Sequence, residues 1–144
     1  MNVDPRLNEI KDCLYRVATK VIIAHEGKLL VVLEKDDDWW NLPGGGVDHG
    51  EEIDQAIVRE LQEEVGLEST DIMAIDKPVF VATNASMDGV PRTNIFYTAN
   101  VRIDALRAGR DVAELRWVTP EEFNALKISP AIASYKEKIL AELR

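Results

Sequence analysis

The sequence predicts an α+β protein in which helices pack on both faces of a central mixed β-sheet. Segments with strand and helix patterns follow one another without strict β-α-β alternation, and no repeat or low-complexity segment interrupts them. The length of 144 residues suits one domain with one core. Apolar residues make up 46% and charged residues 30%, which is an ordinary globular composition. We therefore expect residues 1–144 to form a single domain.

The first elements are expected to be a short helix and a β-hairpin. Asp4 and Pro5 resemble an N-cap and a first helical residue, ahead of apolar residues at helical spacing. Residues 16–24 and 28–34 are rich in Val, Ile and Leu, and the polar segment 25–27 separates them. Two such runs around a short polar turn predict a β-hairpin.

The later elements are predicted from periodicity and turn residues. An extended piece at residues 39–42 ends at Pro43 and a run of glycines, and a helix follows them. The remaining segments are strands near 78–82, 94–101 and 115–118, a loop at 84–92, and helices near 120–126 and 130–143.

Charge and composition exclude several classes of function. Twenty-six acidic residues against 17 basic ones give a formal net charge of −9, which disfavours binding to long DNA or RNA. No apolar run approaches the ~20 residues that span a bilayer, and the first residues lack the order of a signal peptide. Cys13 is the only cysteine, so the sequence offers no intrachain disulfide and no thiolate cluster for zinc. We expect a cytoplasmic protein that does not bind membranes.

The central helix combines an apolar arc with an acidic one. Its apolar positions share one side that can pack on a sheet: Ile57, Val58, Leu61 and Val65. Glu60, Glu63 and Glu64 lie together on the adjacent arc, where their repulsion costs an isolated helix a few tenths of a kcal/mol, roughly, per pair. A solvated acidic face is one explanation. The other is a site for a hard divalent cation, because such ions prefer oxygen ligands.

The glycines before this helix do not form either of two common phosphate-binding signatures. A dinucleotide fingerprint starting at Gly44 requires glycine where the chain has His49, and a P-loop ending at Gly50 requires lysine where it has Glu51. A lysine would meet phosphate directly, whereas a glutamate at this position implies that a cation mediates the contact.

Residues 45–67 match every defined position of a longer pattern, Gx5Ex7REUxEExGU, in which U is aliphatic. With average residue frequencies, a chance match is expected on the order of once in 10 million chains of this length. The segment Trp40-Asn41-Leu42-Pro43-Gly44 is also similar to the W-x-L-P-G that often precedes this pattern. The chain therefore resembles the Nudix (MutT-like) hydrolase family, and the resemblance implies the Nudix fold, an α/β/α sandwich.

The resemblance implies hydrolysis of a diphosphate linkage in a nucleoside diphosphate joined to another group, with Mg²⁺ or Mn²⁺ as cofactor. Matched positions imply that Glu60, Glu63, Glu64 and the carbonyl of Gly44 hold the metal. Glu51 and Arg59 match positions that support the loop and orient the catalytic carboxylate. A further metal ligand often comes from a later loop, and Glu114 sits where many family members have one.

The chemistry of the residues agrees with this implication. A cation that bridges two phosphates neutralises the leaving group and lowers the pKa of a bound water, so that a nearby carboxylate can remove a proton. Glu64 or Glu60 is the candidate for that base. The alternative is a non-catalytic nucleotide-binding module of the same fold, although such modules tend to lose these carboxylates.

Three residues are candidates for contact with a small nucleotide substrate. Arg16 and Arg92 carry guanidinium groups that suit phosphate geometry, and Trp39 can stack on a base. Phe96 is a further candidate for stacking. Neither the Pro of many ADP-ribose hydrolases nor the Tyr of dinucleoside polyphosphate hydrolases occurs at residues 82–84, so the substrate stays open. The sequence is also compatible with a homodimer.

Overall fold

The computed structural model describes residues 14–85 and 89–143. The strands are β1 (Arg16–Ile22), β2 (Ala24–His25), β3 (Lys28–Glu34), β4 (Ile72–Ile75), β5 (Phe80–Ala85), β6 (Pro91–Val101) and β7 (Val112–Val118). The α-helices are α1 (Ile53–Val65), α2 (Pro120–Ala125), α3 (Pro130–Ala133) and α4 (Lys136–Leu140), and two 3-10 turns are η2 (Ser69–Asp71) and η3 (Ile103–Ala105).

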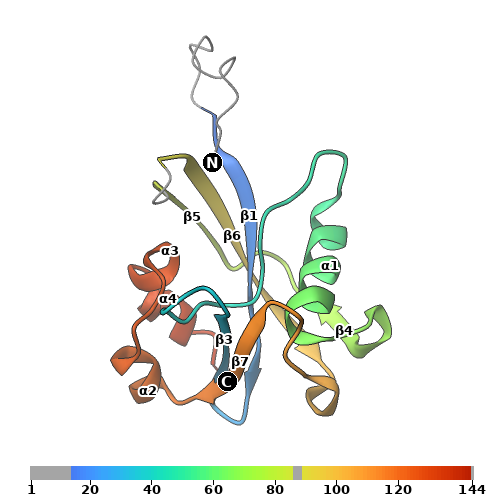
Figure 1. Ribbon diagram of the computed structural model, residues 1–144, viewed down its shortest axis with the longest axis vertical. Coiled ribbons are helices and arrows are strands. Elements are labelled where there is room, and N and C mark those ends of the chain that lie inside the picture. Colours follow the sequence, from blue (N-terminus) through green and yellow to red (C-terminus); the bar gives the residue numbers. More distant parts are fainter. Residues whose placement is uncertain (1–13, 86–88, 144) are drawn as a thin grey trace.

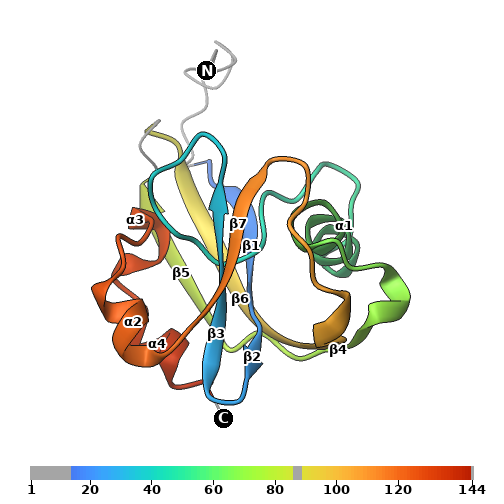
Figure 2. The same ribbon diagram turned by 60° about the horizontal axis from the view of Figure 1, so that its bottom comes forward.

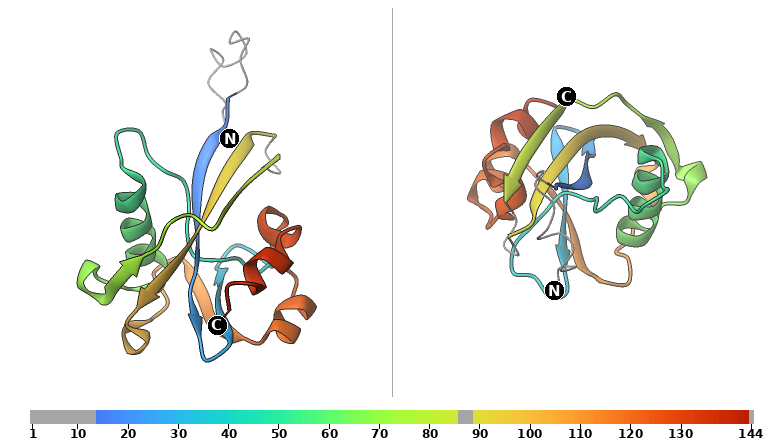
Figure 3. Two further views of the ribbon diagram at one scale, coloured as in Figure 1. Left: turned by 180° about the vertical axis from the view of Figure 1, so that it is seen from behind. Right: turned by 90° about the horizontal axis from the view of Figure 1, so that it is seen from above.

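The strands form two sheets that lie between helices. One sheet is mixed: β1 runs parallel to β6, while β5 and β4 are antiparallel to β6. The other has the order β2-β3-β7 and is antiparallel. Helix α1 covers one side of the strands and α2, α3 and α4 cover the other (Figures 1 and 2). The view from behind shows the same three layers (Figure 3). The predicted α+β sandwich is confirmed.

Each face of the strands packs against its own core. Phe123, Ile132 and Ile139 from the C-terminal helices pack on one face, and Ile57 and Leu61 from α1 pack on the other. Strand β3 contributes to both, because the side chains of its consecutive apolar residues alternate between the two cores. A strand that is buried on both faces needs such an unbroken apolar run.

Helix α1 begins and ends at well-defined caps. Glu52 is the N-cap and forms a capping box with Gln55, while Gly66 ends the helix with a φ of 71°, a conformation that favours glycine. The helix buries Ile57, Leu61 and Val65, and each fully buried aliphatic side chain contributes about 1.5–3 kcal/mol. Val58 was expected to join them, but it is only half-buried and lines a shallow depression on the outer face of the helix. The apolar arc is therefore narrower than predicted.

The predicted hairpin is shorter than expected. The chain turns at Glu26 and Gly27, both at positive φ, as the tight turn of a two-residue hairpin requires. Only the two residues of β2 pair with β3. Strand β1 instead pairs with β6, which lies far away in the sequence. The antiparallel hairpin over residues 16–24 was therefore wrong for most of its length, because the partner of β1 is non-local.

Other boundaries also differ. Asn84 and Arg92, expected in a loop, pair with each other in the β5–β6 ladder. Strand β4 was not predicted, and the last predicted helix is two helices separated by Ser134 and Tyr135. The expected N-terminal helix and Cys13 lie outside the described residues. In the part of the chain that is described, no helix has the length and apolar character needed to cross a membrane.

Candidate active site

The segment Pro43–Val47 runs antiparallel along the edge of β1 that β6 does not occupy. Backbone hydrogen bonds join Val21 to Pro43 at 2.8 Å, Thr19 to Gly45 at 2.9 Å and Val47 to Val17 at 3.0 Å. An isolated bridge pairs Ala18 with Gly46 in the same register. The glycine loop is therefore held to β1 as an additional strand-like segment.

The backbone of this loop approaches β1 too closely for a side chain at Gly44. A Cβ added there would lie 2.1 Å from the carbonyl oxygen of Thr19, and the φ of Gly44 is 134°. Both observations require glycine at this position. The close approach places the N–H of Gly44 beside α1, where it donates to Oε2 of Glu64 at 3.1 Å.

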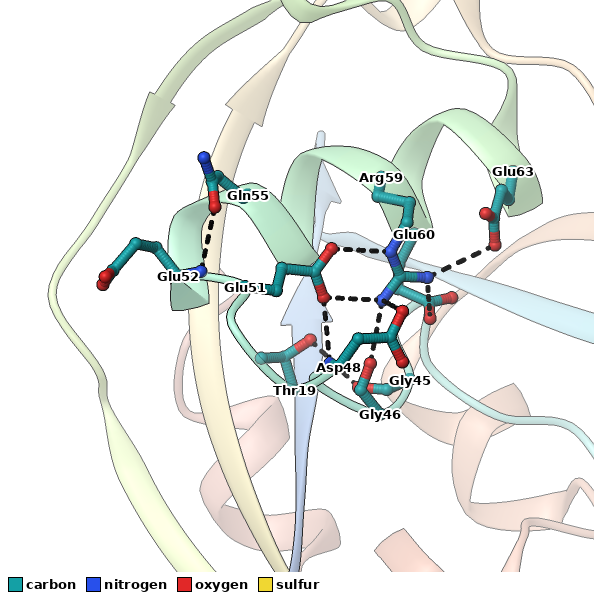
Figure 4. A network of polar contacts seen from close by, with 10 residues as sticks. All are labelled: Thr19, Gly45, Gly46, Asp48, Glu51, Glu52, Gln55, Arg59, Glu60 and Glu63. Carbon is teal, nitrogen blue, oxygen red and sulfur yellow. Dashed lines mark hydrogen bonds and ion pairs between the residues drawn. The ribbon is translucent and has the colours of Figure 1, made fainter.

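Arg59 ties the helix to the loop (Figure 4). Its Nε and Nη2 donate to the two carboxylate oxygens of Glu51 at 2.8 and 2.9 Å, and Nη2 also donates to the carbonyl of Gly46 at 2.9 Å. Its Nη1 donates to Glu60 at 2.9 Å. The hydrogen bond from Arg59 lowers the pKa of Glu51 to about 2. These contacts agree with a role for Arg59 in holding carboxylates in place.

Glu60 and Glu63 share Arg59 as a neighbour. The Glu60 carboxylate is nearly covered and packs against the loop, since a Cβ on Gly45 would lie 2.5 Å from its Oε1. Glu63 is 59% exposed and lies 3.5 Å from Nη1 of Arg59 (Figure 4). Glu60 therefore faces the glycine loop, and Glu63 lies on the same edge of α1 but is exposed to solvent.

Glu64 differs from Glu60 and Glu63 because, within the described residues, it has no arginine partner. In the same part of the chain, its one hydrogen bond comes from the backbone N–H of Gly44. Burial raises the pKa of Glu64 to about 8, and Lys20 and the Gly44 hydrogen bond oppose that shift. A desolvated carboxyl group with few compensating contacts is a common feature of catalytic sites.

The donor set fits a hard divalent cation. Glu60, Glu63 and Glu64 supply carboxylate oxygens from one helix, and two of them contact the loop that carries the Gly44 carbonyl. Within residues 14–85 and 89–143, however, no three acidic, His or Cys side chains already stand close enough together to hold an ion. Glu60 and Glu63 instead pair with Arg59, whereas Glu64 accepts a hydrogen bond from the backbone of Gly44.

Glu114 lies on β7, opposite Leu33 of β3. Its Oε1 accepts hydrogen bonds from Nε and Nη2 of Arg116 at 3.0 and 2.9 Å, and both side chains are about half exposed. The guanidinium of Arg116 also lies 4.5 Å from the centroid of the Trp40 ring. Glu114 is thus an exposed strand residue with an arginine partner, rather than a loop residue.

The three candidate substrate contacts lie in two places. Arg16 and Arg92 are register partners in the parallel β1–β6 pair, and the guanidinium of Arg16 lies against Gly46. Trp39 is half-buried beside Lys127, outside this pair of strands. Phe96 is fully buried and stacks on Phe80, so its expected contact with a base was wrong. The strand pattern places Phe96 on the core face of β6.

Two residues near the site did not emerge from the sequence pattern. Lys20 is buried in β1, with 8% of its surface exposed. Glu34 lies at the end of β3, and burial raises its pKa. The available signal for Lys20 was a lysine in the middle of a mostly apolar strand. A charged residue in a strand with covered faces is rare unless it is paired or functional.

Comparison with known proteins identifies the family. Residues 14–141 match the NUDIX domain. A putative 8-oxo-dGTP diphosphatase of Bacillus subtilis (strain 168) is 32% identical over 111 residues, which cover 74% of this chain and 68% of that protein. An ADP-ribose pyrophosphatase of Methanocaldococcus jannaschii is 32% identical over 132 residues, covering 88% and 71%. The solution structure of the E. coli ORF135 protein is 26% identical, with a TM-score of 0.73 and coverage of 90% and 91%.

The chain therefore belongs to the Nudix family and is a pyrophosphohydrolase that acts on phosphorus-containing anhydrides. The enzymes of this family act on small nucleotide substrates. The fold, the glycine loop and the carboxylates of α1 are the parts of the molecule that carry this identification.

Proposed function

We propose that this protein hydrolyses the diphosphate linkage of a nucleoside diphosphate joined to a further group, using Mg²⁺ or Mn²⁺. The observation that carries this proposal is the convergence of Glu60 and Glu64 on the glycine loop, with Glu64 half-buried and, within residues 14–85 and 89–143, not hydrogen-bonded to a basic side chain. Glu60, Glu63, Glu64 and the carbonyl of Gly44 are the proposed metal ligands. Glu114 is a further proposed ligand, and it must leave Arg116 to serve.

A bound divalent cation would supply positive charge to the leaving phosphate and lower the pKa of a water molecule. Residues of the chain would transfer the proton and hold the reacting groups in position. Glu64 accepts the proton of the attacking water, with Glu60 as the alternative base. Arg59 and Glu51 hold the helix against the loop, so that the carboxylates meet the substrate in a fixed position.

The substrate contacts are proposed from charge and position. Arg16 and Arg92 lie side by side on β1 and β6, and guanidinium groups bind phosphate oxygens well. Trp39 is the proposed stacking residue for a base. The two relatives named above are a diphosphatase of an oxidised nucleotide and a pyrophosphatase of ADP-ribose, which supports the class of nucleotide diphosphates and leaves the individual substrate open.

The test is a panel of nucleoside triphosphates, ADP-ribose, nucleotide sugars and dinucleoside polyphosphates, assayed for phosphate release with Mg²⁺ or Mn²⁺. Hydrolysis is expected for at least one class of substrate, and it should vanish in EDTA and return with either ion. Undiminished turnover in metal-free protein would contradict the mechanism. The same ions should raise the melting temperature, because a ligand that binds only the native state stabilises it.

Arg92→Ala tests the proposed phosphate contact on β6. Loss of a contact made equally in the ground state and the transition state should raise KM more than it lowers kcat. Arg102→Ala is a matched control, since Arg102 is an exposed arginine next to η3 and pairs with Asp71 and Asp104. If both variants keep the KM and the substrate ranking of the wild type, Arg92 does not contact the substrate.

A further inference from the structure

Lys20 lies directly opposite Gly44 across the ladder between β1 and the glycine loop. The hydrogen bonds that flank this pair join Thr19 to Gly45 and Val21 to Pro43. A Cβ on Gly44 would lie 3.0 Å from the Cα of Lys20, which shows how close the two backbones come. Because Gly44 also donates to Glu64, the side chain of Lys20 begins beside the carboxylate of the proposed site.

The ammonium of Lys20 is buried among acidic groups. The residue is 8% exposed, and the charges that act on it most strongly are those of Glu64, Glu34 and Glu60. Burial lowers the pKa of Lys20, and these three carboxylates oppose that shift. Among residues 14–85 and 89–143, its Nζ makes no hydrogen bond and no ion pair. An ammonium has three donors, and leaving them unsatisfied in a buried place is costly.

Lys20 also belongs to a group of three cations on neighbouring strands. Arg16 and Lys20 share one face of β1 because side chains alternate along a strand. Arg92 on β6 is the register partner of Arg16, and its charge acts on Lys20. The charges of Glu64, Glu60 and Arg92 all act on Lys20. A ligand with several negative charges could pair with these three cations, and a metal ion bound to that ligand could pair with the carboxylates of α1.

We infer that Lys20 binds a phosphate oxygen of the substrate's diphosphate group, next to the carboxylates of α1, and is therefore a further substrate-binding residue. The inference rests on the proposed function. It differs from a purely structural explanation, in which Lys20 only balances the charge of Glu34, Glu60 and Glu64. In that case removal of the ammonium would leave diphosphate binding unchanged or make metal binding tighter.

The test uses methylenediphosphonate, a diphosphate analogue that is not hydrolysed, and calorimetric titration of the full chain with saturating Mn²⁺. Lys20→Met removes the charge and keeps an apolar stem, and Lys20→Gln keeps a polar end. Lys28→Met is the control, because Lys28 is exposed at the start of β3. We expect both Lys20 variants to bind the analogue about 10-fold to 100-fold more weakly, as for the loss of a hydrogen bond to a charged group, and the control to bind like the wild type.

Separate titrations with Mn²⁺ alone distinguish the explanations. Binding of Mn²⁺ should be unchanged or tighter in both Lys20 variants. Wild-type affinity for the analogue in these variants, weaker binding of Mn²⁺ alone, or failure of both variants to fold would overturn the inference. If the wild type binds the analogue equally well in EDTA, or does not bind it at all, the proposed function fails together with the inference. Metal-dependent binding by the wild type with unaffected Lys20 variants would reject Lys20 alone.

Discussion

The two halves of the charged edge of α1 satisfy their charges in different ways. In the N-terminal half, Arg59 makes hydrogen bonds to Glu51, Glu60 and Gly46 at 2.8–2.9 Å. In the C-terminal half, Glu64 has one backbone hydrogen bond at 3.1 Å and is desolvated. The pKa of Glu51 falls to about 2, whereas the pKa of Glu64 rises to about 8. The two pKa values therefore move in opposite directions, because desolvation disfavours the charged form of Glu64 whereas the hydrogen bonds from Arg59 favour the charged form of Glu51.

This contrast separates a structural role from a chemical one. The Glu51 carboxylate, which is paired with Arg59, helps to hold the loop and stays ionised near neutral pH. A desolvated carboxyl without such a partner is stabilised by a nearby cation or by a proton, as a metal ligand or a base requires. In the proposed reaction Glu64 is therefore the first candidate for the base, while Glu60 and Glu63 would share their charge between Arg59 and the metal ion.

The largest effect is expected when the uncompensated half loses its charge. Glu64→Gln keeps the shape of the side chain, so the fold should persist while turnover falls about 10²-fold to 10⁴-fold, as for the loss of a general base. Glu121→Gln, at an exposed position of α2, is the control and should keep wild-type turnover. Steady-state kinetics with saturating Mg²⁺ and circular dichroism measure the two properties. Wild-type turnover in Glu64→Gln would show that Glu64 is neither base nor metal ligand.

The stability of the metal-free protein should depend on pH through Glu64. Its pKa is about 8 in the folded protein and 4.5 as the reference for an exposed glutamate, so the native state holds an additional proton between these values. The contribution of Glu64 is therefore fully present below about pH 4.5 and is lost as the pH rises toward 8, at up to about 1.4 kcal/mol per pH unit. Denaturant unfolding in EDTA should show the wild type losing stability relative to Glu64→Gln as the pH rises. A pH-independent difference would contradict the raised pKa.

Removal of Arg59 should lower the stability of the folded protein. Arg59→Ala leaves the Glu51 and Glu60 carboxylates, both largely covered, without their partner, and should cost about 1.5–3 kcal/mol. Lys127→Ala removes an exposed ion pair with Asp38 and should cost less than about 1 kcal/mol. Urea unfolding measures both. Equal losses would mean that the Arg59 network adds no more stability than a surface pair.

The smallest effect is expected from two glycines that lie next to each other. In Gly45→Ala the new Cβ would lie 2.5 Å from the Glu60 carboxylate, which must move, so the affinity for Mn²⁺ should fall by up to about 10-fold. In Gly46→Ala the Cβ would meet the guanidinium of Arg16 instead, at 2.7 Å, and Mn²⁺ affinity should be unchanged. Calorimetry compares the two. Equal Mn²⁺ affinity in both variants would show that the position of Glu60 is unimportant for the metal.

Local patterns predicted the parts of the molecule that depend on near neighbours. Helix α1 and its acidic edge followed from a periodicity of 3.6 residues, and the capping residue Gly66 falls at the end of that pattern. The spacing from Gly45 to Leu67 also predicted which carboxylates share the edge of the helix. The predicted ties of Arg59 agree with the contacts that the structure shows.

Features that depend on distant partners were not predictable in the same way. The pairing of β1 with β6 joins residues about 76 positions apart, as in Arg16 and Arg92, and no local pattern encodes it. For the same reason Phe96 was assigned to a binding role although β6 turns it into the core. Lys20 was overlooked because its significance lies in its neighbours Glu34 and Glu64, which come from other elements.

The position of the glycine loop along β1 has a consequence for the behaviour of the protein at high concentration. A strand at the border of a sheet offers unpaired N–H and C=O groups to other chains, and this is a common route to aggregation. Here the segment Pro43–Val47 occupies that border through its bonds to Val17, Thr19 and Val21. The loop of the proposed active site thereby also keeps β1 from pairing with a second chain, so changes that loosen it should reduce solubility as well as activity.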